Sequence, residues 1–253
     1  LRGIDGKELI ETDALGKKIK SLGQIQPVPG KNLTLSLDLD LQKVTAKEMK
    51  GKIGAVVVSD PKTGEILALY SSPSFDQNRL SDLGNLSNLG DRPFFNRTIS
   101  GLYPPGSTFK IITASAGLET GKITAQTQIE DTGVISVGPF QFPNWYWLQY
   151  GKTDRDVDII KAFKRSNDIF FYRVGEMVGI EKLEEWAKKF GVSKILGIDL
   201  PGEAAGRIRL QRDWYLGDTY HTAIGQGDLE VTPLQVNFWT DVIANEGKLC
   251  RPS

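Results

Sequence analysis

The sequence predicts an α+β fold in which helices flank an antiparallel sheet. The strand signals come first: an alternation of leucine and polar residues over 33–40, and two apolar runs, 53–58 and 65–70, joined by a turn. From residue 107 onward, stretches with a helical spacing of apolar side chains dominate. Because strands and helices occupy separate parts of the chain, we expect the helices to pack on an antiparallel sheet.

The composition indicates an ordinary globular protein of one large domain, with or without a small attached piece. The 31 Lys and Arg balance 31 Asp and Glu, so no basic surface argues for a nucleic-acid partner. The single cysteine, Cys250, excludes an internal disulfide, and the single histidine, His221, excludes a histidine-rich metal site. No apolar run reaches the roughly 18 residues of a membrane-spanning helix. The first residues do not resemble a signal peptide.

The N-terminal part contains one linker-like segment and one strand-like segment. Residues 1–30 are polar and glycine-rich, and we expect an irregular lead-in or linker. The alternation over 33–40 predicts a strand with one buried face. Asp40 is then expected to cap a helix that ends near Met49.

The apolar runs 53–58 and 65–70 flank an Asp-Pro-Lys-Thr-Gly turn at 60–64. This turn chemistry between two apolar runs predicts a hairpin. Residues 71–100 are rich in Ser, Asn, Asp, Gly and Pro without a period, so we expect a loop there.

A Pro-Pro-Gly break at 104–106 precedes Ser107, from which the apolar spacing predicts a helix that Gly121 ends. Residues 122–152 indicate loops and short strands. They include three aromatic residues at 145–147, which either line a groove or, as is more common, form local core. Further helices are expected at 157–164, just after Asp168, at 180–190 and from Pro233.

Two Ser-x-x-Lys patterns occur in the chain, Ser59 with Lys62 and Ser107 with Lys110. A serine and a lysine three residues apart lie side by side only on a helix. Ser59 enters a turn between strands, whereas Ser107 is expected to open a helix. Only the Ser107 and Lys110 pair could therefore act as a nucleophile and its activating base. From this pattern alone, an N-cap serine beside a solvated surface lysine is the more common interpretation.

The start of a helix favours this chemistry in two ways. Unpaired backbone N–H groups there can bind a developing oxyanion. The positive end of the helix dipole disfavours a charged Lys110, and a lysine must be neutral to accept a proton from serine. Lowering its pKa from about 10.4 to near neutrality costs roughly 4 kcal/mol. We expect burial and the helix end to supply this together.

Residues 97–110 closely resemble the active-serine segment of penicillin-binding proteins. Three other segments resemble the family: 60–68 its first sheet strands, 37–42 its junction of pedestal and transpeptidase domains, and 225–235 a segment that supports its active site. The resemblance implies the fold shared by penicillin-binding proteins and serine β-lactamases. It also implies that residues 1–30 end the non-catalytic pedestal domain and residues 31–253 form the transpeptidase domain.

The family's second motif, Ser-x-Asn on a turn between helices, corresponds to Ser166, Asn167 and Asp168. The resemblance implies that Ser166 relays a proton to the leaving group. Some elongation-type members have aspartate at the third position, and a charged Asp168 favours a charged Lys110 unless desolvation outweighs it. Without the resemblance, Ser166 and Asp168 are a helix C-cap and N-cap pair. The residues expected to contact substrate are Asn167, Gly225, Gln226 and Gly227.

The family's third motif, Lys-Thr/Ser-Gly on a strand, does not follow Gly227 in this chain, and we expect it beyond Ser253. Lys-Thr-Gly at 62–64 has the right letters, but it precedes the nucleophile and lies in a tight turn. A strand that flanks a substrate needs extended geometry. The connections around 49–51 and 208–211 are short for the family.

The resemblance implies a class B, monofunctional D,D-transpeptidase of the elongation type. In it, Ser107 attacks the penultimate D-Ala of a peptidoglycan stem peptide, and β-lactam antibiotics acylate the same serine. It implies no metal and no cofactor, and partners that include a membrane glycan polymerase and the elongation complex. It places the domain outside the cytoplasmic membrane, anchored by an N-terminal helix absent from this chain. The alternatives are a β-lactamase or D,D-carboxypeptidase on the same fold, and a non-catalytic β-lactam-sensing or scaffold domain.

Overall fold

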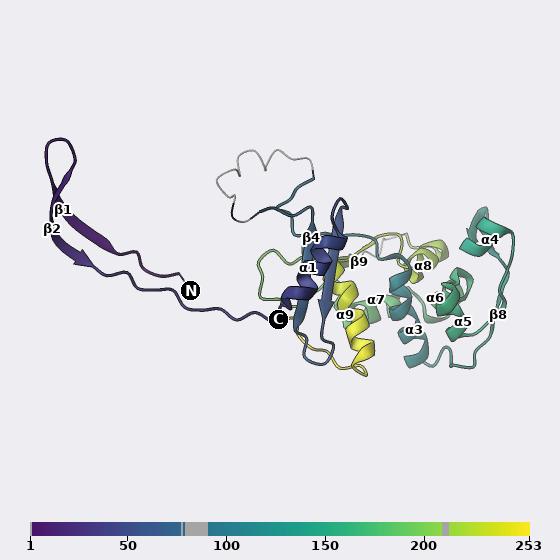
Figure 1. Cartoon of the computed structure of the whole chain (residues 1–253). Coiled ribbons are helices and arrows are strands. Elements are labelled where there is room, and N and C mark those ends of the chain that lie inside the picture. The colour runs from purple at the N-terminus through teal and green to yellow at the C-terminus, as the bar shows by residue number, and fades with distance from the viewer. Residues whose placement is uncertain (1, 77, 79–90, 209–212) are drawn as a thin grey trace. The chain divides into compact units, whose positions relative to one another are not determined.

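The computed structural model describes residues 2–76, 78, 91–208 and 213–253 of the chain (Figure 1). The chain divides into two units, with the boundary between Ser36 and Leu37. The assignment of the first unit to a pedestal domain stays a prediction. Among the described residues, no helix has the length and apolar character needed to cross a membrane.

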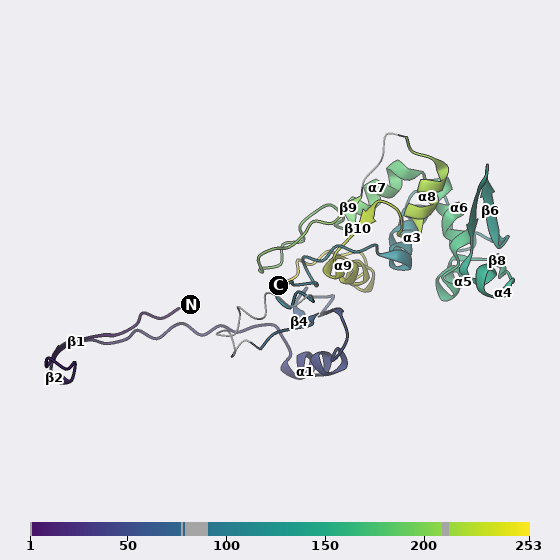
Figure 2. The same cartoon turned by 90° about the horizontal axis from the view of Figure 1, so that it is seen from above.

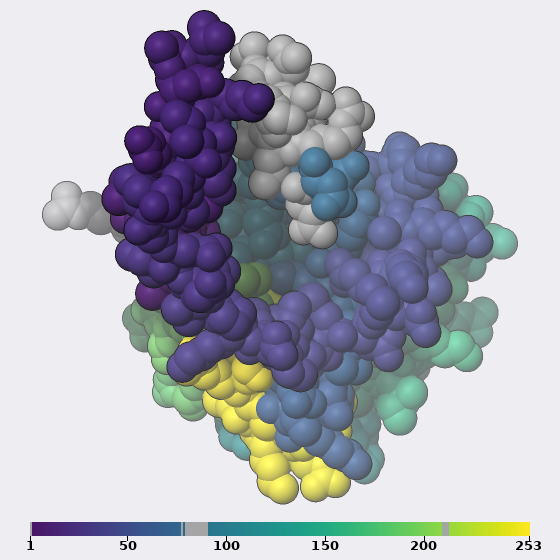
Figure 3. All heavy atoms as spheres, turned by 60° about the vertical axis from the view of Figure 1, so that its left-hand side comes forward, coloured from purple at the N-terminus to yellow at the C-terminus, as the bar shows by residue number. Residues whose placement is uncertain are grey.

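The first unit contains an antiparallel hairpin, so the expectation of an irregular lead-in is wrong. β1 (Lys7–Thr12) pairs with β2 (Lys18–Ile25), and both strands are exposed throughout, as Figure 3 shows for one face. The Asp13 carboxylate closes the turn by accepting the backbone N–H groups of Leu15 and Lys17, both at 2.9 Å. Neither strand has a buried face that would impose a period of two on its sequence, and the pattern therefore gave no strand signal.

The strand predicted over 33–40 is also wrong. In the described structure no strand pairs with this segment, and its leucines are 38–65% exposed. Its end enters α1 (Leu39–Glu48), whose N-cap is Asp38 and not Asp40. The Asp38 carboxylate accepts the N–H of Leu41 at 2.9 Å. The alternation thus predicted a buried face for leucines that are exposed in the structure.

The predicted hairpin between two apolar runs is confirmed. β3 (Gly54–Ser59) pairs antiparallel with β4 (Ile66–Ser72). α1 contacts β4 and α9 (Pro233–Ala244) contacts β3, and Figure 2 shows the two helices on opposite sides of the hairpin. The Gln42 side chain fixes α1 to the hairpin, because it bonds both the N–H and the C=O of Leu69, at 2.9 and 2.8 Å.

The other long helices pack around α6, most of which is buried. The contacting elements are α6 (Asp168–Val178), α3 (Lys110–Glu119), α5 (Ile159–Arg165), α7 (Ile180–Lys189) and α8 (Leu216–Ala223). Gly175 lets α8 approach α6, since a Cβ at this position would lie 2.5 Å from the Cβ of Ala223. The sequence did not predict α8, because its threonine, aspartate and histidine side chains obscure the apolar period.

Short elements complete the second unit and confirm the short strands expected over 122–152. They are β5 (Ile129–Asp131) with β8 (Arg155–Val157), β6 (Val134–Val137) with β7 (Phe140–Pro143), β9 (Arg207–Ile208) with β10 (Leu229–Glu230), and α4 (Trp145–Tyr150). The helix expected from residue 157 begins two residues later, because Val157 ends β8 and the Asp158 side chain caps α5.

Candidate active site

Ser107 lies on η2 (Gly106–Phe109), a 3₁₀ turn that leads directly into α3. Gly106 has a left-handed φ of +57°, which lets the chain turn before the serine. Its N–H donates to the carbonyl oxygen of Gly225 at 2.9 Å. A Cβ on Gly225 would lie 2.1 Å from the carbonyl oxygen of Gly106, so only glycine fits there. Gly225 therefore supports the turn that carries Ser107, as expected for the 225–235 segment, but it does not line the cavity as a residue in contact with substrate would.

Lys110 is buried at the first position of α3, with 1% of its surface exposed. Its Nζ donates to the backbone oxygen of Ser166 at 2.9 Å, to Ser166 Oγ at 3.1 Å and to Asp168 Oδ1 at 2.6 Å. Burial lowers the pKa of Lys110, and the Asp168 carboxylate opposes this without cancelling it. The alternative of a solvated surface lysine is wrong, and the competition between desolvation and Asp168 favours desolvation.

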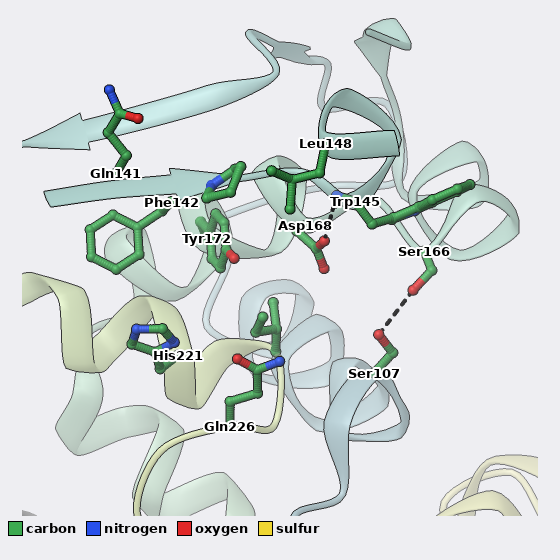
Figure 4. Close-up of a pocket in the computed structure, with 12 residues that line it drawn as sticks. Ser107, Gln141, Phe142, Trp145, Leu148, Ser166, Asp168, Tyr172, His221 and Gln226 are labelled. Carbon is green, nitrogen blue, oxygen red and sulfur yellow. Dashed lines mark hydrogen bonds between the residues drawn. The ribbon is translucent and has the colours of Figure 1, made fainter. Parts of the chain in front are cut away.

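Ser166 connects Ser107 to Lys110. Its Oγ donates to Ser107 Oγ at 3.0 Å (Figure 4), and it accepts from Lys110 Nζ at 3.1 Å. The lysine thus reaches Ser107 through Ser166, whereas the sequence suggested a direct contact one helical turn away. Ser166 is also the C-cap of α5, with a left-handed φ of 49°. The structure thus shows the capping role of Ser166, and its role as a proton relay stays a prediction.

Asp168 lies beside Lys110, as expected, whereas Asn167 has a capping role that was not expected. Asp168 lines the cavity, and its Oδ2 accepts the N–H of Trp145 at 3.2 Å (Figure 4). Asn167 is the N-cap of α6, since its side chain accepts the N–H of Phe170 at 2.9 Å, and Asp168 is the first helical residue. Asn167 is fully buried. It does not line the cavity, so the structure does not support its expected contact with a substrate.

A cavity of about 580 Å³ opens in front of Ser107. Six of the residues that line it are Ser107, Ser166, Asp168, Phe142, His221 and Gln226. Of the expected loop residues only Gln226 reaches this cavity, and Gly227 does not line it. In the part of the chain that the structure describes, no cluster of three or more His, Cys, Asp or Glu residues could hold a metal ion.

Several cavity residues were not expected from sequence. His221 lies beside the ring of Phe142, with centroids 5.4 Å apart, and both side chains face the cavity (Figure 4). Burial raises the pKa of Tyr172, and the Asp168 charge raises it further, so its hydroxyl stays protonated. Trp145 lines the cavity from α4, which has no buried residue, so the groove interpretation of the aromatic cluster is correct for this tryptophan. The aromatic cluster was the one sequence signal for this wall.

The side chains of Ser59 and Lys62, the other Ser-x-x-Lys pair, do not bond to each other. Ser59 ends β3, and its Oγ donates to the carboxylate of Asp241 at 2.5 Å. Lys62 lies in the turn after the strand and its side chain makes no bond to Ser59. Gly64 has a φ of +84°, so the Lys-Thr-Gly letters belong to a turn and not to an extended strand. These geometries agree with the expectation that neither the Ser59 and Lys62 pair nor the Lys-Thr-Gly turn is catalytic.

The short connection at 49–51 is a tight turn, in which Gly51 has a φ of +75° and the N–H of Lys52 donates to the oxygen of Met49 at 3.0 Å. In the other short connection, residues 209–211 lie outside the described residues.

Comparison with known proteins places these observations in a family. A model of the penicillin-binding protein transpeptidase domain matches residues 54–253. "Peptidoglycan D,D-transpeptidase MrdA" of Acinetobacter baumannii is 37% identical over 98% of this chain, and the chain spans 38% of that protein. The chain thus covers well under half of the length of this curated relative.

Solved structures agree on the fold. The complex of PBP2 and MreC from Helicobacter pylori has a TM-score of 0.82 and 34% identity, over 98% of this chain and 48% of that chain. PBP2 of Pseudomonas aeruginosa in complex with WCK 5153 has a TM-score of 0.81 and 35% identity, over 89% and 54%. The predicted α+β transpeptidase fold is confirmed.

Proposed function

This chain belongs to the family of penicillin-binding protein transpeptidase domains, and from that premise we propose that its protein is a peptidoglycan D,D-transpeptidase of cell-wall elongation. The observation that supports this most strongly is the continuous hydrogen-bonded path from Ser107 through Ser166 to the buried Lys110. A serine hydroxyl is a weak nucleophile unless a base takes its proton.

The reaction follows from this path. With Lys110 neutral, both hydrogen bonds of the path reverse, so that Ser107 donates to Ser166 and Ser166 donates to Lys110 Nζ. Ser107 Oγ then attacks the carbonyl carbon of the penultimate D-Ala while its proton passes to Ser166, and Ser166 passes its own proton to Lys110. The peptide C–N bond then breaks, and the same path returns a proton to the departing D-Ala amine. The amine of a neighbouring stem peptide attacks the ester on Ser107, forms the cross-link and restores the serine. Backbone N–H groups near the helix start stabilise the oxyanion in both steps.

The proposed reaction also needs a Lys-Thr/Ser-Gly strand, which would complete the pocket. Such a strand would supply the second oxyanion N–H and a cation for the substrate carboxylate. The cavity already has the nucleophile and the relay on one side, with Gln226 also lining it. β-Lactams mimic the acyl donor, so they are expected to acylate Ser107 and to deacylate slowly.

The proposal extends to partners and location. The H. pylori structure is a complex of PBP2 with MreC, which supports a place for this protein in an elongation complex. A membrane glycan polymerase would supply the glycan strands that it cross-links. The domain would act on the outer face of the cytoplasmic membrane, held by an N-terminal helix in a part of the protein outside this chain.

In the decisive assay, the full-length protein is incubated with glycan strands that carry intact stem peptides, and the resulting muropeptides are analysed. A transpeptidase forms cross-linked dimers and releases D-Ala, and Ser107→Ala forms none. Release of D-Ala without dimers would identify a carboxypeptidase, and rapid hydrolysis of a β-lactam would identify a lactamase. A folded protein that does neither and only binds β-lactams would be a sensor or scaffold domain. Each of these three outcomes would refute the proposal.

A further inference from the structure

Asp131 is a buried carboxylate that no sequence pattern singled out. It ends β5, and only 2% of its surface is exposed. Its two oxygens accept four hydrogen bonds from neutral donors, and no Lys or Arg in the described structure pairs with it. The four donors are Gly133 N at 2.9 Å, Asn144 Nδ2 at 2.9 Å, Asp154 N at 2.8 Å and Asn167 Nδ2 at 2.9 Å. A buried charge is tolerated where hydrogen bonds satisfy it in this way.

Two of these donors lead directly to the catalytic turn. Asn167 lies between Ser166 and Asp168 in the chain and also caps α6. Asn144 donates to Asp131 with its Nδ2 and accepts the N–H of Asp168 with its Oδ1, at 3.2 Å. The residue after Asn144 then donates its own N–H to Asp168 Oδ2. Asp168 is therefore held by its backbone and by its carboxylate, and both contacts depend on the segment that Asp131 anchors.

The turn needs such an anchor, because Ser166 adopts a left-handed φ of 49°, a conformation that a residue with a side chain rarely adopts. A third donor to Asp131 fixes Arg165, the residue before Ser166. The N–H of Asp154 donates to Asp131, and its carboxylate accepts from Arg165 Nε at 3.0 Å. Arg165, Asn167 and Asp168, the residues that flank Ser166, are thus connected to one carboxylate, either directly or through one intermediate.

We propose that Asp131 is a positioning residue for acyl transfer. It holds the turn so that Ser166 Oγ stays within 3.0 Å of Ser107 and Asp168 stays within 2.6 Å of Lys110. Asp131 does not line the cavity and touches no reacting atom. This inference rests on the proposed function, since it assigns the network to that reaction. Misplacement of a catalytic group by about 1 Å can reduce a rate by about a hundredfold.

The test uses Asp131→Asn in the full-length protein. In Asp131→Asn an NH₂ group replaces one of the two carboxylate oxygens. At least one of the four N–H donors then loses its acceptor, so the turn loses part of its anchor. We measure acylation by a fluorescent penicillin and separate the dissociation constant of the initial complex from the rate constant of the acylation step. We expect the acylation rate constant to fall about 10- to 100-fold, with the dissociation constant changed less than about threefold. Thermal unfolding shows the temperature range in which each variant is folded.

The matched control is Glu130→Gln, which removes one negative charge from an exposed neighbour on the same strand. It should acylate at the wild-type rate. If Asp131→Asn does not fold, Asn144→Ala decides the matter, because it cuts the link to Asp168 and leaves the carboxylate in place. An unchanged acylation rate constant in the folded variant, or a loss confined to the dissociation constant, would overturn the inference. Failure of the wild-type protein to acylate would refute the proposed function and this inference with it.

Discussion

Replacement of Asp168 by asparagine tests whether Lys110 is the group whose deprotonation controls acylation. Lys110 Nζ lies 2.6 Å from Asp168 Oδ1, and the lysine side chain is only 2% exposed. Burial lowers the pKa of Lys110, and the Asp168 charge raises it. An opposite charge this close typically changes a pKa by about one to three. Asp168→Asn removes only the effect that raises the pKa, so the pKa of Lys110 falls further.

The sign of the expected change follows directly. Acylation needs neutral Lys110, so its rate rises as the pH rises through the pKa of this amine. In Asp168→Asn this rise should occur about one to three pH units lower than in the wild type. The maximal rate should also fall, by about tenfold, because the amide nitrogen cannot accept the N–H of Trp145 that Oδ2 now accepts. We measure the second-order rate constant of acylation by a fluorescent penicillin as a function of pH.

Asp156→Asn is the control, because this aspartate is exposed on β8 and its carboxylate makes no contact with Lys110. Its pH profile should match that of the wild type. A profile of Asp168→Asn whose acidic limb stays in place, or moves to higher pH, would show that Lys110 is not the controlling base.

Three further substitutions test other parts of the site. Ser166→Ala breaks the path between Ser107 and Lys110. It should slow acylation about 10²- to 10⁴-fold at unchanged melting temperature; a loss under tenfold would exclude the relay. Gly225→Ala adds a Cβ 2.1 Å from the oxygen of Gly106 at a φ of +77°. It should destabilise the protein by about 1–3 kcal/mol in denaturant titration and slow acylation, and wild-type values for both would contradict the support role. Ser59→Ala should acylate within about twofold of the wild type and lose roughly 1 kcal/mol of stability, because among the described residues its hydroxyl bonds to Asp241 and Asn237, outside the candidate site. A large loss of acylation would reinstate Ser59 as a candidate.

The sequence predicted those elements whose pattern comes from local rules. The β3–β4 hairpin has turn residues between two apolar runs, and α9 has Pro233 at its start with a Thr232 cap. The segment at 33–40 was misread, because an alternating pattern says nothing about whether a partner strand exists. β1 and β2 were missed for the opposite reason, since both strands are exposed and polar.

The same distinction between local pattern and tertiary packing applies to the candidate site. Ser107, Lys110 and Ser166 were found because their letters, order and helix starts fit a known family. The burial of Asn167 and the 2.1 Å approach at Gly225 could not be predicted, since both depend on the tertiary packing of distant segments. Asp131 left no signal at all. Its four donors come from residues 2 to 36 positions away, and only the folded chain brings them together.

The central claim is that Ser107 forms the acyl-enzyme. Its most direct test is mass spectrometry of the intact protein after incubation with a β-lactam, followed by peptide mapping. One β-lactam per protein should be attached, on the peptide that contains Ser107, and Ser107→Ala should gain none. An adduct on another residue, an adduct that persists in Ser107→Ala, or a folded wild-type protein without any adduct would contradict the claim.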